Sequence, residues 1–211
     1  MPIDTVLTLY TYDELASTAK AKAKDWWLSC RDETDYESVI DDFTVIAETL
    51  GIDLKTHAVT LMSGKTRQDA NVWYSVGYCQ SDFAAFDGAY QYAKGSAKAI
   101  RQHAPKDSEL QRIADELAKL QKANAYQLRA TVAYHKYYGL QSEVIRETKA
   151  GLWVDPTDGA DMAFSGLIKD LAKWLYRELV KQDEWISSDE NIAESMEANE
   201  YTFREDGRRE G

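Results

Sequence analysis

The sequence predicts an α+β fold in which several amphipathic α-helices pack against an antiparallel β-sheet. Apolar residues recur at three- and four-residue spacing in several segments, which is the pattern of helices with one buried face. Residues 125–135 instead alternate cleanly between two faces and lead into a hairpin connection at Gly139, which indicates antiparallel strands. With 211 residues, 44% of them hydrophobic, the chain can bury one substantial core. We therefore expect a single domain over residues 1–211 that ends in a short charged tail at about residues 205–211.

Three capping boxes predict where helices begin. In this motif a Ser or Thr and a Glu three residues later satisfy each other's backbone N–H groups, and the spacing occurs at residues 11–14, 34–37 and 187–190. The apolar spacing extends these helices to about residues 28, 50 and 199, and Gly51 ends the second of them. Further helices are predicted at residues 94–103, from Pro105 onward and at residues 161–185.

Segments rich in β-branched and aromatic residues predict the strands. They cover residues 3–10, 53–61, 72–79, 88–93, 125–135, 142–148 and 201–203. Residues 72–79 carry aromatic and apolar side chains on both faces, so we expect this strand in the centre of the sheet. Alternation places Cys79 beside that buried strand, where a packed thiol is expected rather than a nucleophile.

Charge and cysteine content limit the classes of partner and compartment. The net charge of -11 repels nucleic acid and attracts basic partners, so no direct nucleic-acid binding is expected. Only two cysteines, Cys30 and Cys79, are present, which excludes a disulfide framework and fits a reducing cytoplasm. No apolar run has the length of a signal segment or a membrane span, so we expect a cytoplasmic protein without membrane association.

The familiar catalytic and cofactor motifs are absent. His57, His103 and His135 lack the spacing of a zinc site, and the G-K-T at residues 64–66 lacks the glycine of a phosphate-binding loop. An E-x-K triplet at residues 147–149 has no acidic partner upstream of the kind a metal-dependent nuclease requires. We therefore predict neither a metal site nor a cofactor.

An aromatic-rich loop is the first candidate site. Residues 72–93 combine seven aromatic side chains with two carboxylates, and the segment that would line a pocket contains Gln80, Asp82, Phe83, Phe86 and Asp87. Asp82 and Asp87 are candidates for an acid/base pair or for cation binding, and the imidazole of His135 at a hairpin end is a third candidate group. The alternative role for the two Asp residues is to shape turns by accepting backbone hydrogen bonds.

Two carboxylate-rich helical surfaces form the second candidate site. Both segments lack interspersed Lys or Arg, and their acidic residues are Asp35, Glu37, Asp41, Asp42 and Glu48 in the first and Asp183, Glu184, Asp189, Glu190, Glu194 and Glu197 in the second. Two such surfaces side by side would imitate the charge spacing of a nucleic acid and fit a basic groove on a partner. The alternative is that each is a solvated helix face.

Four segments carry a resemblance to a known family. They are W-Y-S-V-G-Y-C-Q-S-D-F-A-A-F-D-G at residues 73–88, Y-H-K-Y-Y at 134–138, W-L-Y-R-E-L at 174–179 and N-E-Y-T-F-R-E-D-G-R at 199–208. The chain resembles a family of small phage and prophage proteins, many of which are labelled "antitoxin of toxin-antitoxin stability system". The family's loop usually reads S-Q-G-D-G-A followed by an aromatic residue, whereas residues 80–86 here lack both loop glycines.

This resemblance implies an origin in a mobile element, and small acidic proteins of such origin are often inhibitors of host defence. The predicted function is therefore that of a non-enzymatic, anti-CRISPR-type inhibitor in a bacterial host cell. Its partner would be a host protein or ribonucleoprotein complex with a basic surface, and a homodimer is a further expected assembly. Two alternatives remain open: an antitoxin that binds a cognate toxin, and an enzyme that uses Asp82, Asp87 and His135.

Overall fold

The computed structural model describes residues 7–30, 33–77 and 80–210, so Cys79 and residues 3–6 of the strand predicted at residues 3–10 lie outside the described residues. Helices pack with antiparallel sheets in an α+β fold, which confirms the predicted class. The chain forms two compact units. Unit 1 contains Met1–Glu37 and Lys181–Gly211, and unit 2 contains Ser38–Val180.

The largest sheet of unit 2 has five strands in the order β1, β6, β7, β8 and β9, and each neighbouring pair is antiparallel. The strands are Ile52–Leu54, Gly88–Gln91, Leu128–His135, Gly139–Glu147 and Trp153–Val154. In β7 the side chains of Leu128, Ala130 and Val132 are buried while those between them are exposed. This confirms the alternation over residues 128–132 and the hairpin at Gly139. Ala125 and Tyr126, predicted as the start of this strand, instead lie in a turn with φ values of 56° and 60°.

The helices of unit 2 supply most of its apolar core. They are α2 (Glu37–Leu50, whose first residue belongs to unit 1), α3 (Ser96–His103), α4 (Ser108–Ala123) and α5 (Ala160–Ile186, which continues into unit 1). Buried side chains include Phe43, Ile46, Ile113, Leu117, Phe164 and Leu171. Gly51 ends α2 as predicted: its φ is 89°, and a Cβ there would lie 2.2 Å from the carbonyl oxygen of Gln91.

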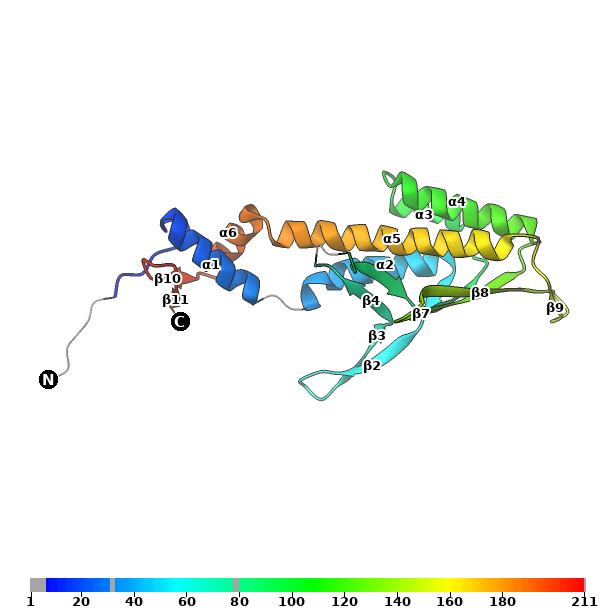
Figure 1. Cartoon of the computed structure of the whole chain (residues 1–211), viewed down its shortest axis with the longest axis horizontal. Helices are drawn as coiled ribbons and strands as arrows, with labels where there is room; N and C mark the ends of the chain where they lie inside the picture. Colours follow the sequence, from blue (N-terminus) through cyan, green and yellow to red (C-terminus); the bar gives the residue numbers. More distant parts are fainter. Residues whose placement is uncertain (1–6, 31–32, 78–79, 211) are drawn as a thin grey trace. The chain divides into compact units, whose positions relative to one another are not determined.

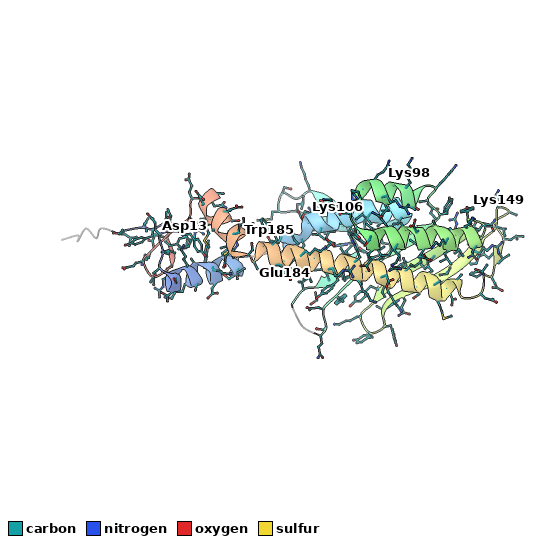
Figure 2. All side chains as sticks on the ribbon, turned by 90° about the horizontal axis from the view of Figure 1, so that it is seen from above. Asp13, Lys98, Lys106, Lys149, Glu184 and Trp185 are labelled. Carbon is teal, nitrogen blue, oxygen red and sulfur yellow. The ribbon has the colours of Figure 1, made fainter. Side chains whose placement is uncertain are left out.

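One carboxylate fixes the packing of α4 against α5. Asp107 is the N-cap of α4, where its Oδ1 accepts a hydrogen bond from the backbone N–H of Leu110 at 2.8 Å. Its Oδ2 accepts a second bond from Nε1 of Trp174 in α5 at 2.6 Å. The two helices run beside each other in both views (Figures 1 and 2). The helix therefore begins at Ser108, after this cap, rather than at the predicted Pro105.

Three continuous strand segments exchange partners at one junction. Residues 52–60, 66–75 and 83–91 each pass from one two-stranded ladder to another, and the exchange occurs at Lys55, Asn71 and Asp87. The N–H of Lys55 donates to the carbonyl of Asp87 (3.0 Å), that of Asn71 to Lys55 (2.7 Å) and that of Asp87 to Asn71 (3.0 Å). We call this closed cycle of three backbone hydrogen bonds the strand junction.

The strand junction corrects two sequence-based predictions. The strand predicted at residues 53–61 divides into β1 and β2 (Thr56–Thr60), and β2 pairs with β3 (Thr66–Ala70) in a hairpin that extends away from the rest of unit 2 (Figure 1). The predicted central strand at residues 72–79 is β4 (Val72–Ser75), which pairs with β5 (Phe83–Phe86) outside the five-stranded sheet. Periodicity shows which residues are extended, but it does not show where an extended segment changes partner.

Unit 1 packs two helices around a small core. The helices are α1 (Ser17–Ser29) and α6 (Asp189–Ala198), and a single turn, η1, covers Glu33–Tyr36. The buried core residues are Leu15, Ala19, Ala23, Ile192, Met196 and Phe203. The predicted box at residues 11–14 forms only in part: the Glu14 carboxylate accepts bonds from the N–H (2.8 Å) and the hydroxyl (3.0 Å) of Thr11, but the N–H of Glu14 donates to the carbonyl of Thr11 (3.2 Å) instead of its hydroxyl. These bonds close a separate turn, so α1 begins only at Ser17.

The predicted charged tail is part of the fold of unit 1. Strand β10 (Thr202–Phe203) pairs with β11 (Arg209–Glu210), and the guanidinium of Arg209 lies over the rings of Trp26 (4.9 Å) and Tyr201 (4.5 Å). Gly207 in the connecting turn has a φ of 85°, and a Cβ there would lie 2.2 Å from the carbonyl oxygen of Ala19. The glycine lets the hairpin approach the backbone of α1 closely.

Candidate functional site

Asp82 stabilises the connection between β4 and β5. Its Oδ1 accepts a hydrogen bond from the hydroxyl of Ser75 at 3.2 Å, and its Oδ2 accepts one from the backbone N–H of Gly77 at 3.0 Å. The hydroxyl of Tyr176 on α5 lies 3.5 Å from the same Oδ2. These contacts match the turn-forming role, in which a carboxylate satisfies the backbone donors of a tight connection.

Asp87 holds the strand junction against β7. Its backbone forms two of the three junction bonds, and its Oδ1 accepts a hydrogen bond from the N–H of Tyr134 at 2.7 Å. His135 is exposed at the end of β7, where its carbonyl accepts the N–H of Tyr138 at 3.1 Å. Within the described residues no hydrogen bond joins Asp82, Asp87 and His135 to one another. Both Asp side chains therefore act as structural acceptors.

The two phenylalanines of the predicted loop site pack against α2 and against β7. Phe86 is buried, with its ring centroid 5.2 Å from that of Phe43 in α2. Phe83 stacks on Tyr134 at 5.2 Å with an interplanar angle of 22°. The loop thus has an apolar, packed side, and its polar residues Gln80 and Ser81 are exposed.

The acidic residues around α2 divide between the two units. Asp35, half-buried, and Glu37, exposed, belong to unit 1, whereas Asp41, Asp42 and Glu48 are exposed on the unit 2 part of α2. The Oδ1 of Asp42 lies 2.7 Å from Nε2 of His103 on α3. Three of the five predicted surface carboxylates are therefore exposed along one helix of unit 2.

Asp183 is a correction to the second acidic surface. Only 6% of the residue is exposed, and its Oδ1 accepts a hydrogen bond from the hydroxyl of Tyr36 at 2.6 Å. The side chain lies on the buried side of α5, since Ile186, three residues further along the helix, is also buried. A buried carboxylate needs such a donor, and Asp183 serves the packing of unit 1 instead of its surface.

The remaining acidic residues of this set are exposed on unit 1. Asp189 pairs with Lys24 at 2.5 Å. Glu184, Glu190, Glu194 and Glu197 are exposed and have no ion-pair partner among the described residues. Residues 190, 194 and 197 follow four- and three-residue spacing on α6, opposite the buried Ile192 and Met196, so they form one row. We call Glu190, Glu194, Glu197 and the following Glu200 the α6 acidic face.

The α6 acidic face differs from the charged surface of unit 2, where carboxylates are commonly paired. Examples are Arg101 with Asp115, Arg112 with Asp170, Lys119 with Glu116, Arg129 with Glu147 and Arg177 with Glu109. Like charges at this helical spacing repel each other by roughly 0.2–0.5 kcal/mol per pair. Glu197 also lies in the last turn of α6, where the helix dipole disfavours an anion. The face therefore costs stability that no ion pair among the described residues recovers.

A pocket opens beside the α6 acidic face. It has a volume of about 280 Å³ and is formed entirely by unit 1. Its side chains include Tyr12, Asp13, Met196, Glu197, Glu200 and Tyr201. Burial raises the pKa of the Tyr12 hydroxyl above its ordinary value, and the nearby carboxylate of Asp189 adds to this effect. The pocket thus combines neutral aromatic side chains with three carboxylates.

Sequence reasoning did not identify this pocket. Tyr10 pairs with Phe203 through backbone bonds of 2.8 and 2.9 Å, which brings residues 11–13 to the turn that follows α6. No spacing within either segment indicates that they meet. The described residues also contain no group of three or more His, Cys, Asp or Glu side chains arranged to hold a metal ion. None of the described helices combines the length and apolar character needed to cross a membrane.

The fold and the sites define an acidic α+β protein with structural carboxylates in unit 2 and, on unit 1, an acidic face that lacks ion-pair partners among the described residues. Residues 36–189 match the family described as "Domain of unknown function (DUF8835)", and the chain belongs to this family. The match covers unit 2, whereas the pocket residues lie outside it. Searches of curated proteins and of solved structures returned no match to the chain.

Proposed function

We propose that this protein is a non-enzymatic inhibitor of the anti-CRISPR type that binds a basic surface of a defence or nucleic-acid-binding complex in a bacterial host. The α6 acidic face is the observation that carries the proposal, because its carboxylates are exposed and lack partners among the described residues. The resemblance of residues 73–88 and 199–208 to phage and prophage proteins supports the assignment to host defence. The hydrogen-bonded, structural state of Asp82 and Asp87 favours binding over catalysis.

The spacing of the row suits a surface that normally holds phosphates. Carboxylates three or four residues apart on a helix are separated by about 4.5–6 Å along its axis. One strand of B-DNA carries a charge every 3.4 Å or so along the axis, which is a comparable density. A basic groove that neutralises phosphates would therefore attract this row over a distance of about one Debye length, roughly 10 Å at 0.1 M salt.

An exposed tryptophan adds an apolar anchor in the same unit. Trp185 at the end of α5 is 49% exposed and follows the exposed Glu184 (Figure 2). Its carbonyl accepts the hydroxyl of Ser188, the N-cap of α6, at 2.7 Å. Tryptophan is enriched among the residues that dominate binding energy at protein interfaces. Trp185 is thus the apolar residue we assign to the contact.

The proposal is tested by phage infection of a strain that carries an active RNA-guided defence complex. Expression of the wild-type protein should raise the plating efficiency of a targeted phage, and Glu190→Lys with Glu194→Lys should abolish this effect. The introduced lysines would face the basic surface of the partner, and such like-charge contacts cost several kcal/mol of binding free energy across an interface. The matched control, Glu143→Lys with Asp158→Lys, makes the same change in net charge at exposed sites of unit 2 and should leave the effect intact.

Binding is measured in parallel by quantitative affinity purification from the same strain. The defence complex should be recovered with the wild-type protein and with the control, and recovery should fall as salt is raised from 50 to 500 mM. Unchanged plating efficiency with the wild-type protein, or equal recovery of the complex by the α6 double variant, would overturn the proposal. Charge reversal at Asp41 and Asp42 then shows whether the exposed carboxylates of α2 also contribute to binding.

A further inference from the structure

The pocket of unit 1 has the composition of a binding site for a positively charged side chain. Its aromatic and thioether side chains, Tyr12, Tyr201 and Met196, provide surface for an aliphatic stem. Its carboxylates, Asp13, Glu197 and Glu200, provide acceptors for a cationic head group. No basic residue is among those that line it. The volume of about 280 Å³ is larger than one arginine side chain.

Two cations of the chain itself show that these rings attract positive charge. The Nζ of Lys20 lies 5.2 Å from the centroid of the Tyr12 ring, and the guanidinium of Arg209 lies 4.5 Å from that of Tyr201. Both distances are within the range of a cation–π interaction. Neither Lys20 nor Arg209 lines the pocket, so its volume remains accessible to a group from outside.

The two carboxylates supplied by the α6 side of the pocket are available for a ligand. Asp13 is held 3.6 Å from Lys20, whereas Glu197 and Glu200 have no ion-pair partner among the described residues. Glu200 follows the end of α6 with a φ of 53°, and the N–H groups of Glu200 and Tyr201 donate to the carbonyls of Glu197 (2.9 Å) and Met196 (3.0 Å). This reverse turn brings Glu200 and Tyr201 together at the pocket.

We propose that the pocket binds one lysine or arginine side chain of the basic partner. The stem packs on Met196 and the tyrosine rings, and the head group meets the carboxylates of Glu197 and Glu200. This inference rests on the proposed function, because the α6 acidic face supplies both glutamates. It adds a defined cavity, and hence a preference for an extended cationic side chain over a diffuse basic surface.

The test is a nuclear magnetic resonance titration of the full chain with small probes. Nα-acetyl-lysine methylamide and Nα-acetyl-arginine methylamide should shift the amide signals of residues 11–13 and 196–202, with a dissociation constant on the order of 1 mM. The matched probe Nα-acetyl-norleucine methylamide has the stem without the charge and should cause much smaller shifts. A free diamine, 1,4-diaminobutane, that bound more tightly than both charged amides would overturn the assignment to a protein side chain.

Charge-neutral variants locate the binding groups. Glu197→Gln and Glu200→Gln preserve side-chain size. Each should lower the affinity for the charged probes about two- to fivefold, which is the range of an exposed ion pair. The control Glu190→Gln removes the same charge from the α6 acidic face outside the pocket lining and should change probe affinity less than either. Equal affinity in all three variants, or equal shifts from the norleucine and lysine probes, would overturn the inference.

The two proposals fail in different ways. The charged probes could cause no shifts at residues 196–202 while Glu190→Lys with Glu194→Lys still abolishes recovery of the defence complex. In that case the assignment of the pocket is wrong and the proposed function stands. If the probes bind as expected but the wild-type protein neither recovers the complex nor changes phage plating, the pocket binds cations and the anti-defence function is wrong.

Discussion

The carboxylate of Asp87 and the backbone N–H of Tyr134 are joined by a 2.7 Å hydrogen bond that links the strand junction to β7. Asp87→Ala leaves that donor without its acceptor, so we expect a loss of about 1–3 kcal/mol in the free energy of unfolding. Asp87→Asn retains an acceptor oxygen and should lose less. Urea denaturation measures both, with the exposed Glu143→Ala as the control. A stability of Asp87→Ala equal to wild type would show that the bond has no structural role.

Gly207 should be the more sensitive of two glycines with similar backbone angles. Gly207 and Gly64 have φ values of 85° and 76°, but only at Gly207 would a Cβ meet other atoms, at 2.2 Å from the carbonyl oxygen of Ala19. Gly64→Ala should cost about 1 kcal/mol from the left-handed backbone alone. Gly207→Ala should cost clearly more and perturb the fluorescence of Trp26, which Arg209 contacts. Equal losses in the two variants would contradict the close approach to α1.

Replacing Glu200 with glycine should raise stability and weaken binding. The residue has a φ of 53° at a position where glycine is normally preferred, so Glu200→Gly should raise the free energy of unfolding by about 0.5–1 kcal/mol. The same change removes a pocket carboxylate and should weaken the lysine probe. Glu194→Gly, inside α6, is the control and should lower stability by about 1 kcal/mol. Thermal denaturation and the probe titration together check this pair of outcomes.

Ionisation of the buried Tyr90 hydroxyl should lower the free energy of unfolding at high pH. Burial raises the pKa of its hydroxyl to about 12, above the ordinary value near 10, and a hydrogen bond with Gln121 partly opposes this effect. A group with a raised pKa in the folded state contributes its full stability below the unfolded pKa and loses it as pH rises through the folded pKa. We expect a decline of roughly 2–3 kcal/mol between pH 10 and 12 that Tyr90→Phe removes. Urea midpoints at these pH values measure it.

Trp185 should contribute more to binding than to stability. About half of the residue is exposed, and Trp185→Ala leaves intact the backbone carbonyl that accepts the Ser188 hydroxyl. Truncation of an interface tryptophan typically costs 2 kcal/mol or more of binding free energy, so recovery of the defence complex should fall strongly. The melting temperature should fall only by the smaller amount that the buried half of the side chain contributes. The control is the exposed Trp153→Ala in β9 of unit 2, which should leave recovery unchanged.

The sequence predicted the regular elements better than their partners. The end of α2 at Gly51 and the alternation of β7 follow from local patterns of residues, which is why both are confirmed. The partner exchange at Lys55, Asn71 and Asp87 depends on three segments meeting in space. The local signal of this exchange is a polar residue in the middle of an otherwise extended segment. Such residues are common on exposed strands, so they do not identify the exchange.

The candidate sites show the same limit. Exposure of the residues that form the α6 acidic face follows from helical spacing, since Ile192 and Met196 occupy the opposite side. Asp183 is also acidic, but it lies on the buried side of α5. Its hydrogen-bond partner, Tyr36, is 147 residues away in sequence. The pocket depends on the pairing of Tyr10 with Phe203, which no pattern in either segment predicts.

The strand junction also has a consequence for the way unit 2 opens. Its three backbone bonds, donated by Lys55, Asn71 and Asp87, close one ring, so breaking any one of them leaves one N–H donor and one carbonyl acceptor unpaired at residues that join two ladders. We expect the exposed β2–β3 hairpin to exchange its amide hydrogens rapidly through local fraying that stops at this ring. The ring amides should exchange only when all three ladders separate, so a single slow rate shared by these residues would mark the boundary between local and global unfolding.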